Sequence, residues 1–240
     1  MSDWTHEEYK KLLGYKGQKG TNEIMKLDTT NLKADVNWVT SGAVTAVKNQ
    51  GQCGSCWAFS TTGSIEGADQ IAGGDLTSLS EQQLMDCSKA EGNQSCNGGL
   101  MDNAFKYVKK HALDTESSYP YTAKDGRKCK ASGSGVGHIT GFMDVTSDSP
   151  DDMMAAIAKG PVSIAIEADK SVFQRYTGGV ITSRKCGKKL DHGVLAVGYS
   201  SGDGNGDAYF LVKNSWGASW GVDGYVKISA SSENVCGILS

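Results

Sequence analysis

The change in residue pattern along the chain constrains its fold most strongly. Residues 56–112 repeat apolar side chains at the spacing of α-helices, whereas from about residue 134 short β-rich runs are separated by Gly and Ser. A chain that is helical first and strand-rich afterwards is expected to form an α+β fold of two lobes, with its functional site in the cleft between them. The strand-like runs cover residues 162–166, 194–199, 209–213 and 225–228.

Local signals predict where several helices begin and end. One helix is expected to begin at Cys56 and to stop at the glycine pair 73–74. Residues 80–83 read Ser-Glu-Gln-Gln, the capping-box pattern in which the first and last side chains each bond the other residue's backbone N–H. A further helix, with Ser149 as its cap and Pro150 at its first position, interrupts the strand-rich half.

Composition argues against two classes of partner. The 240 residues carry a formal net charge of −3, and no run of Lys or Arg is longer than two, so binding to nucleic acid is not expected. No apolar stretch approaches the roughly 20 residues that span a bilayer, so no membrane partner is expected either. Met1 leads directly into a polar helical pattern, and we expect a targeting segment to lie outside these residues.

The seven cysteines indicate an oxidising compartment, where three disulfides and one free thiol are a natural count. Residues 93–95 (Asn-Gln-Ser) form a glycosylation sequon, which agrees with a secretory route. We therefore expect the protein to reside in a lysosome or vacuole, or to be secreted.

The stretch 50–59, Gln-Gly-Gln-Cys-Gly-Ser-Cys-Trp-Ala-Phe, carries the strongest chemical signal. Cys56 lies where a glycine-rich loop becomes a helix, and the positive end of a helix stabilises a thiolate. The side-chain amide of Gln50, together with the Cys56 backbone N–H, could bind a developing oxyanion. Cys53 and Cys56 could instead form a redox pair or half of a zinc site. Zinc normally needs a second Cys/His pair, however, and a thioredoxin-like pair should follow a strand.

A thiolate nucleophile needs a base, and the chain has four histidines, of which two are expected to be solvated. His192 opens an apolar strand, which favours it slightly over His138. Asn214 decides between them, because it follows a strand that can pair with the His192 strand and bring its amide to the imidazole. Trp216 is expected to cover that hydrogen bond and shield it from water.

These residues resemble the papain family of cysteine proteases, whose signature is the Cys-Gly-Ser-Cys-Trp sequence around Cys56. His192 follows Cys56 by 136 residues and Asn214 by 158, whereas the family signature places both roughly 130–150 residues downstream. A glycine-rich insertion at 201–206 explains the later Asn. The resemblance implies a papain-like fold with a helical N-terminal lobe and a β-barrel-like C-terminal lobe around the active-site cleft. These lobes are expected mainly at residues 56–130 and 134–240.

The sequence Cys-Asn-Gly-Gly-Leu-Met-Asp at 96–102 is most similar to the cathepsin L branch of the family. In that branch the double glycine, here Gly98 and Gly99, pairs with the substrate as an added strand. The resemblance implies that four apolar residues line the pocket for the second substrate residue before the scissile bond (P2): Leu100, Met101, Ala165 and Leu190. An apolar pocket predicts a preference for Leu, Phe or Val at P2. It also implies three disulfides, Cys53–Cys96, Cys87–Cys129 and Cys186–Cys236, and leaves Cys56 free.

Residues 1–31 resemble the last part of the family's inhibitory propeptide, and residues 32–240 resemble its catalytic domain. The sequence leaves open whether this leader blocks the cleft. The resemblance implies peptide and protein substrates, with the propeptide and cystatin-like inhibitors as further partners. No metal or cofactor is expected, and the protein is expected to be a monomer.

The predicted function is a cysteine endopeptidase that works through a Cys-His-Asn triad and an acyl-enzyme thioester. By analogy with papain, the pKa of the Cys56 thiol is expected to be low. Two alternatives remain open at this point. One is a catalytically silent relative that only binds its partners, and the other is a thiol-dependent transferase that passes the acyl group to an amine instead of water.

Overall fold

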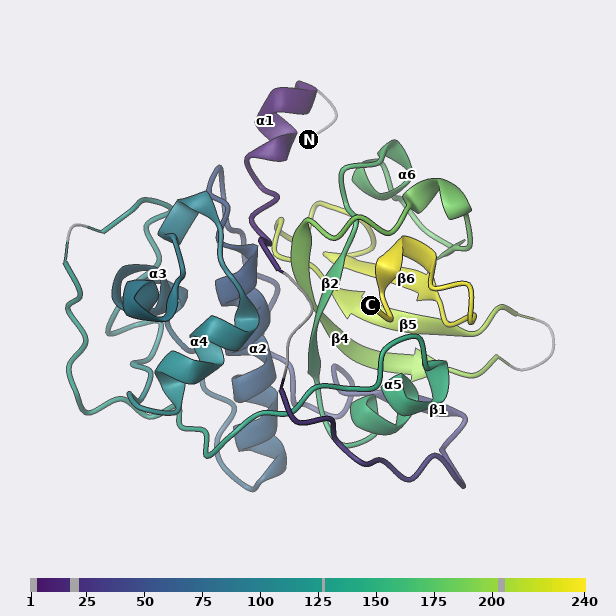
Figure 1. Ribbon diagram of the computed structural model, residues 1–240, viewed down its shortest axis with the longest axis horizontal. Helices are drawn as coiled ribbons and strands as arrows, with labels where there is room; N and C mark the ends of the chain where they lie inside the picture. Colours follow the sequence, from purple (N-terminus) through teal and green to yellow (C-terminus); the bar gives the residue numbers. More distant parts are fainter. Residues whose placement is uncertain (1–3, 18–21, 127, 203–205) are drawn as a thin grey trace.

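A computed structural model describes residues 4–17, 22–126, 128–202 and 206–240. Figure 1 shows two lobes side by side, a helical lobe and a lobe built on a sheet, which confirms the predicted α+β architecture. The helical lobe contains α2 (Cys56–Ile71), α3 (Glu81–Cys87) and α4 (Met101–Val108). Each lobe has its own cluster of buried apolar side chains. None of the helices in the described part of the chain is long and apolar enough to cross a membrane.

The second lobe is built on a six-stranded sheet in the order β1-β4-β5-β6-β3, with β2 also paired to β4. Four of the five pairings are antiparallel, and β3 and β6 run parallel. The strands are β1 (Asp35–Asn37), β2 (Val162–Ile166), β3 (Val180–Ile181), β4 (His192–Ser200), β5 (Tyr209–Lys213) and β6 (Tyr225–Ser229).

Shorter helices complete the two lobes. They are α1 (His6–Lys10), α5 (Pro150–Ile157), α6 (Ser171–Gln174) and the 3₁₀ turns η1 (Ser88–Glu91), η2 (Ser95–Asn97), η3 (Arg184–Cys186) and η4 (Val235–Gly237). The predicted cap of α5 is present, because Ser149 Oγ accepts the Asp152 N–H at 3.2 Å.

Only half of the capping box predicted at residues 80–83 forms. Ser80 Oγ accepts the Gln83 N–H at 3.0 Å, but the Ser80 N–H donates to the Asp114 carbonyl instead of to the Gln83 side chain. The Gln83 side chain is buried, and its oxygen accepts the Asp114 N–H at 2.6 Å. A tertiary partner has therefore replaced the local one.

Helix α2 joins the lobes, since one of its faces lies against the sheet. Ser60 Oγ donates to the Val194 carbonyl at 2.7 Å, and Ser163 Oγ donates to the Ser60 carbonyl at 2.8 Å. Gly63 permits this approach, because a Cβ there would lie 2.7 Å from a methyl carbon of Leu195. The helix that begins at Cys56 is thus held directly against β4.

Three disulfides are present, and they match the pairs that the family resemblance implies: Cys53–Cys96, Cys87–Cys129 and Cys186–Cys236. Cys56 is the free cysteine and is buried. Because Cys53 is bonded to Cys96, Cys53 and Cys56 do not form a redox pair.

Candidate active site

The Cys56 thiol lies at the junction of the two lobes. Cys56 is the first residue of α2, so its sulfur lies at the positive end of a 16-residue helix. The N–H of Gly193, the second residue of β4, donates to its Sγ at 3.3 Å. The sulfur is therefore positioned by one lobe and contacted by the backbone of the other.

His192 and Asn214 are brought together by the pairing of β4 with β5, in which Leu195 lies opposite Lys213. His192 Nε2 and Asn214 Oδ1 are 2.8 Å apart. Asn214 Oδ1 also accepts the Ser215 N–H at 2.8 Å, which identifies this atom as the oxygen. Neutral His192 therefore carries its proton on Nε2. Its Nδ1 is buried and has no hydrogen-bond partner among the described residues.

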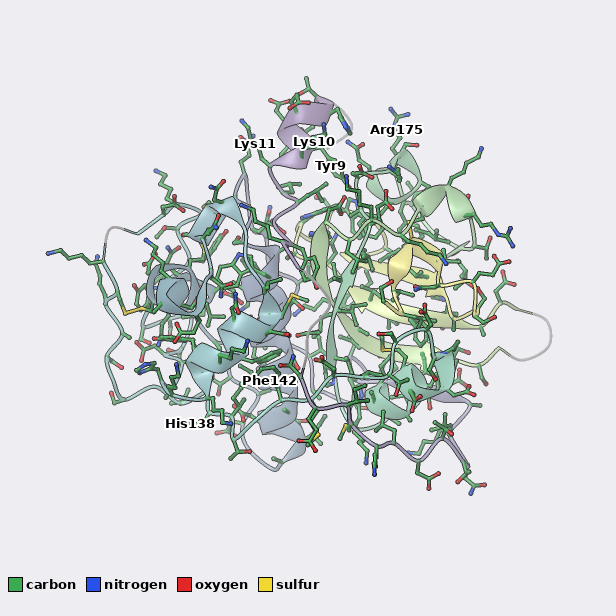
Figure 2. The ribbon with its side chains drawn as sticks, in the orientation of Figure 1. Tyr9, Lys10, Lys11, His138, Phe142 and Arg175 are labelled. Atoms are coloured by element: carbon green, nitrogen blue, oxygen red, sulfur yellow. A yellow bond between two sulfur atoms is a disulfide. The ribbon has the colours of Figure 1, made fainter. Side chains whose placement is uncertain are left out.

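Aromatic rings shield this hydrogen bond, as the sequence predicts for Trp216. The Trp216 ring stacks on the His192 ring with centroids 4.6 Å apart, and the His192 side chain has no exposed surface. His138, the alternative base, is exposed on the outer edge of the helical lobe, away from the cleft (Figure 2).

Gln50 is fully buried, and its amide orientation is fixed by three partners. Its Nε2 donates to the carbonyl of Cys53 at 2.7 Å and to the carbonyl of Leu12 at 2.9 Å. Its Oε1 accepts the Ser215 hydroxyl at 2.7 Å. One amide hydrogen of Gln50 is therefore directed at a carbonyl of the leader, next to Cys56.

The leader runs through the cleft between the lobes, as Figure 1 shows below α1. The Gly99 N–H donates to the Gly14 carbonyl at 2.8 Å, and the Lys16 N–H donates to the Gly99 carbonyl at 3.2 Å. On the opposite wall, the Asp191 carbonyl accepts the Tyr15 N–H at 3.0 Å. Leader residues 12–16 thus bond both walls of the cleft, and Cys56 is fully buried beneath them.

Helix α1 anchors the leader on the β lobe. Tyr9 is fully buried, its hydroxyl donates to the Ala168 carbonyl, and its ring meets Trp216 edge-on with centroids 5.2 Å apart (Figure 2). A complete capping box begins α1, because Thr5 Oγ1 accepts the Glu8 N–H at 3.2 Å and Glu8 Oε2 accepts the Thr5 N–H at 2.8 Å.

Burial under the leader favours the neutral forms of the catalytic pair. Burial raises the pKa of the Cys56 thiol to about 11, although backbone N–H groups, chiefly that of Gly193, act in the opposite direction. Burial also lowers the pKa of His192 to about 4, against the effect of its hydrogen bond to Asn214. The low thiol pKa expected from the sequence is therefore not found in this covered state, because neither charge can be solvated.

Several of the residues expected to bind substrate lie near the leader or near Gly193. Gly98 and Gly99 are buried against the leader, and a Cβ on Gly98 would lie 2.6 Å from the Gly14 carbonyl oxygen. Met101 is buried, with its sulfur near Gly193, and Ala165 lies opposite Gly193 in the β2–β4 pair. Leu100 is half-buried just before α4, and Leu190 is half-buried two residues before β4.

Two residues that the sequence did not single out contribute to the site. Ser215 orients Gln50 through its hydroxyl and Asn214 through its N–H. Asp191 bonds the leader through its carbonyl, and burial raises the pKa of its carboxyl to about 7. Both are neighbours of catalytic candidates in the sequence, but no residue pattern indicates these backbone and orienting roles.

One further expectation, drawn from the sequon, and the disfavoured zinc alternative find no support in the structure. Asn93 of the sequon is buried, its amide donates to Ser88 Oγ at 2.9 Å, and its oxygen accepts the Leu100 N–H at 2.9 Å. This side chain is inaccessible to glycosylation, so the sequon is wrong as an argument for a secretory route. Among the described residues no group of three or more His, Cys, Asp or Glu side chains could hold a metal ion, which leaves the zinc alternative without a ligand set. The insertion at 201–206 lies partly outside the described residues.

Comparison with known proteins identifies the family. The model of the papain family cysteine proteases matches residues 32–240, so the chain belongs to that family and is a papain-like cysteine endopeptidase, a hydrolase.

The relatives include precursors of cathepsin L. The chain is 48% identical over 248 residues to procathepsin L of Mus musculus, an alignment that covers 100% of this chain and 74% of the relative. It is 47% identical over 246 residues to digestive cysteine proteinase 3 of Homarus americanus, covering 100% and 76%. The solved structure of digestive procathepsin L 3 from Tenebrio molitor larval midgut superposes with a TM-score of 0.88 at 41% identity, covering 99% of this chain and 77% of that one.

Proposed function

We propose that this endopeptidase uses Cys56 as nucleophile, His192 as proton carrier and Asn214 as the residue that orients the histidine. The observation that carries the proposal is the direction of His192. Its Nε2 is held by Asn214, which leaves the unpartnered Nδ1 to exchange a proton with the thiol. Gln50 and the Cys56 N–H bind the oxyanion, a role supported by the hydrogen bond that Gln50 Nε2 already donates to the Leu12 carbonyl.

In this mechanism the proton of Cys56 passes to His192 Nδ1, and the thiolate attacks the carbonyl carbon of the scissile peptide bond. The tetrahedral oxyanion is bound by Gln50 and the Cys56 N–H and collapses to a thioester as the imidazolium protonates the leaving amine. His192 then removes a proton from water, which hydrolyses the thioester and regenerates the thiol. Asn214 Oδ1 accepts a hydrogen bond from the Nε2–H group throughout and keeps the imidazole in the reactive orientation.

The proposed substrate preference is for an apolar residue at P2. Gly98 and Gly99 pair with the substrate backbone, at the place where Gly99 now pairs with the leader. Trp216 covers the catalytic pair on the side where the substrate segment after the scissile bond lies. The P2 pocket is formed by Leu100, Met101, Ala165 and Leu190, all apolar, and a Leu, Phe or Val side chain fits this lining.

Residues 1–31 are proposed to be the end of an inhibitory propeptide, and residues 32–240 the catalytic domain. The hydrogen bonds of the leader to Gly99, Asp191 and Gln50 support this division, because they occupy groups that a substrate needs. We further propose a monomeric enzyme of a lysosome, vacuole or extracellular space that is open to cystatin-like inhibitors. Three disulfides in 240 residues agree with an oxidising compartment.

The test is a series of fluorogenic peptides that differ only at P2, assayed with the activated enzyme at about pH 5.5 in a reductant. Leu, Phe and Val are expected to give the highest kcat/KM, and Gly and Arg much lower values. Cys56→Ala and alkylation by an epoxide should each abolish turnover. Equal rates for all P2 residues would contradict the proposed pocket. Faster release when an amine acceptor is added, with transfer in place of hydrolysis, would favour the transferase.

A further inference from the structure

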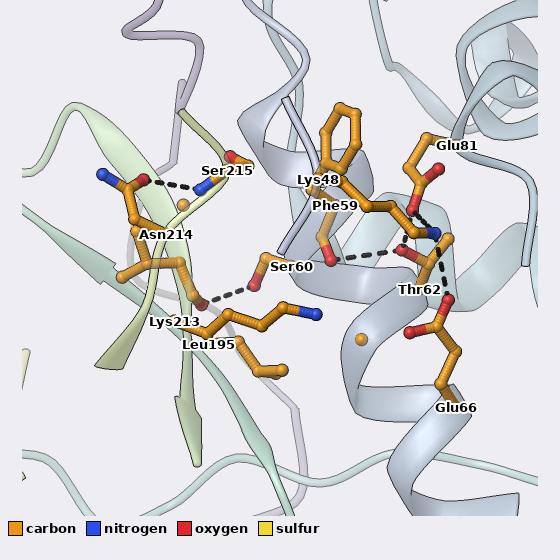
Figure 3. Close-up of a pocket in the computed structure, with 13 residues that line it drawn as sticks. Lys48, Phe59, Ser60, Thr62, Glu66, Glu81, Leu195, Lys213, Asn214 and Ser215 are labelled. Atoms are coloured by element: carbon orange, nitrogen blue, oxygen red, sulfur yellow. Dashed lines mark hydrogen bonds and ion pairs between the residues drawn. The ribbon is translucent and has the colours of Figure 1, made fainter. Parts of the chain in front are cut away.

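A cluster of charged side chains is buried between the lobes, on the side of α2 that faces the sheet. Glu66 and Glu81 are 2% and 0% exposed, and Lys213 is 9% exposed. They surround a cavity of about 20 Å³ that extends to the backbone of Gly193 and Asn214. Figure 3 shows Lys213 reaching from its strand toward the helix that carries Glu66. The catalytic mechanism above uses none of these side chains.

On the helical side, both carboxylate oxygens of Glu66 have hydrogen-bond partners. Glu66 Oε1 accepts the Lys48 ammonium at 3.2 Å and the Leu79 N–H at 2.9 Å, and its Oε2 accepts the Thr45 hydroxyl at 2.6 Å. Lys48 also donates to Glu81 Oε1 at 2.6 Å. This network fixes Thr45 Oγ1 relative to α2, the helix that begins at Cys56.

Lys213 connects this network to the β lobe. It is the last residue of β5 and directly precedes Asn214. Its Nζ donates to Thr45 Oγ1 at 3.1 Å, and the same hydroxyl donates to Glu66. A continuous path of hydrogen bonds therefore runs from the end of β5, through Thr45 and Glu66, to α2.

This arrangement is a poor source of stability. Burial lowers the pKa of Lys213 to about 8, which means that the buried position disfavours the charged ammonium form. Glu66 and Glu81 favour the ammonium and Lys48 opposes it, but the hydrogen-bond acceptor that Lys213 has in the structure is a neutral hydroxyl. An apolar side chain of the same length generally fits such a place at equal or lower free energy. The lysine therefore calls for a role other than stability.

We propose that Lys213 and Thr45 are positioning residues for catalysis: their hydrogen bond across the lobe interface sets the place of Asn214 and His192 relative to Cys56. Proton transfer between thiol and imidazole depends steeply on their separation, and the two groups belong to different lobes. Holding the end of β5 to α2 fixes that separation at the point where Asn214 leaves the strand. This inference rests on the triad roles proposed above.

The test compares Lys213→Met, Thr45→Val and the double variant with the wild-type chain after activation. Lys213→Met keeps the length of the side chain and removes its charge. Each single variant is expected to lower kcat about tenfold with little change in KM. The double variant should lose no more than either single one, because both remove the same hydrogen bond. The acid limb of the pH–rate profile should move in both single variants, and the midpoint of thermal unfolding of Lys213→Met should stay equal or rise.

Two matched controls separate positioning from general damage. Thr45→Ser keeps the hydroxyl and should retain wild-type kcat and pH profile. Lys227→Met removes a lysine of β6 whose ammonium lies over the Tyr209 ring, outside the cluster, and should leave both parameters unchanged. If Lys213→Met does not fold, the comparison of Thr45→Val with Thr45→Ser tests the inference by itself.

The inference is overturned if Lys213→Met has wild-type kcat and an unshifted profile, or if Thr45→Val and Thr45→Ser have equal kcat. It is also overturned if the losses of the two single variants multiply in the double variant. Cys56→Ala is measured in parallel to distinguish a failure of this inference from a failure of the proposed triad. Turnover in that variant would contradict the triad itself.

Discussion

At the scale of single residues, one oxygen atom fixes the orientation of the proposed catalytic histidine. Asn214 Oδ1 accepts from both His192 Nε2 and the Ser215 N–H, each at 2.8 Å, so the amide cannot turn without losing both bonds. Trp216 stacks on the imidazole and keeps water away. A hydrogen bond in such a site is stronger than in water, and the imidazole orientation is fixed before a substrate arrives.

Asn214→Ala should lower kcat/KM by about 10- to 100-fold, since a buried hydrogen bond of this kind contributes about 1–3 kcal/mol. Asn214→Asp keeps an acceptor oxygen at the same place and should lose less. Steady-state kinetics of the activated enzyme measure both. Wild-type activity in Asn214→Ala would show that the Asn does not orient the histidine.

The sequence predicted the residues at the site and the Asn214–His192 contact, but not the contacts of Ser215 and Lys213 that support them. Cys56 is identified by its local signature, and His192 and Asn214 by the strands that they adjoin. Ser215 escaped prediction because its hydroxyl contacts Gln50, 165 residues away along the chain. The Lys213–Thr45 bond spans 168 residues and has no local signal either.

At the scale of elements, the leader is the part of the chain whose position matters most for activity. Its helix α1 is too short to be stable in isolation and depends on its capping box and on the buried Tyr9. Beyond it, Gly14 lies so close to the Gly54 carbonyl oxygen that a Cβ at Gly14 would overlap it. The leader can thus lie over the thiol only with glycine at this position.

Gly14→Ala should therefore weaken the docking of the leader and raise the activity of the unprocessed chain. Gly141→Ala is the matched control, because a Cβ there meets no atom within 4 Å. Hydrogen exchange of the Tyr15 and Lys16 amides in a Cys56→Ala background measures the docking without self-cleavage. Equal protection of these amides in both glycine variants would contradict the proposed fit.

The elements were predictable where a local signal coincides with a tertiary role. The start of α2 at Cys56 and the Ser149 cap of α5 are of this kind. Strand β1 (Asp35–Asn37) was not predicted, since three residues are too few for an alternating pattern and β1 is defined by its pairing with β4. The capping box at 80–83 is half formed because burial gave Gln83 a distant partner.

At the scale of the whole molecule, docking of the leader in the cleft is coupled to proton binding by buried side chains, and therefore depends on pH. The pKa of His192 is about 4 under the leader, below its ordinary value of 6.5. In a Cys56→Ala chain, where no thiol can pass its proton to the imidazole, departure of the leader and entry of water restore the affinity of His192 for a proton, so acid favours the open state between these two values. Asp191 acts in the opposite sense, since burial raises its pKa to about 7. His192 is fully sealed whereas Asp191 is only half-buried, so we expect the effect of His192 to dominate.

The leader should accordingly be held fully above about pH 6.5 and loosen as the pH falls toward 4, by at most about tenfold per unit from His192. Protection of the Tyr15 and Lys16 amides in Cys56→Ala, corrected for intrinsic exchange, reports this. Adding Asp191→Asn should steepen the loss, because the opposing group is removed. Protection that is constant or grows toward pH 4 would contradict this linkage.

The division into a helical and a strand-rich lobe followed from the residue pattern, because each lobe buries its own apolar cluster. The path of the leader did not follow from any pattern. It depends on backbone hydrogen bonds to Gly99 and Asp191, which belong to opposite lobes and make no demand on side-chain type.

The measurement that tests the account most directly is a time course of peptide cleavage by the full chain. The purified protein would be moved from pH 7.5 to about pH 5 in a reductant, with a fluorogenic peptide carrying Leu at P2. We expect negligible turnover at the start, a lag while the leader leaves the cleft, and then steady cleavage that Cys56→Ala abolishes. Full activity before the pH change, or cleavage that survives Cys56→Ala, would contradict the account.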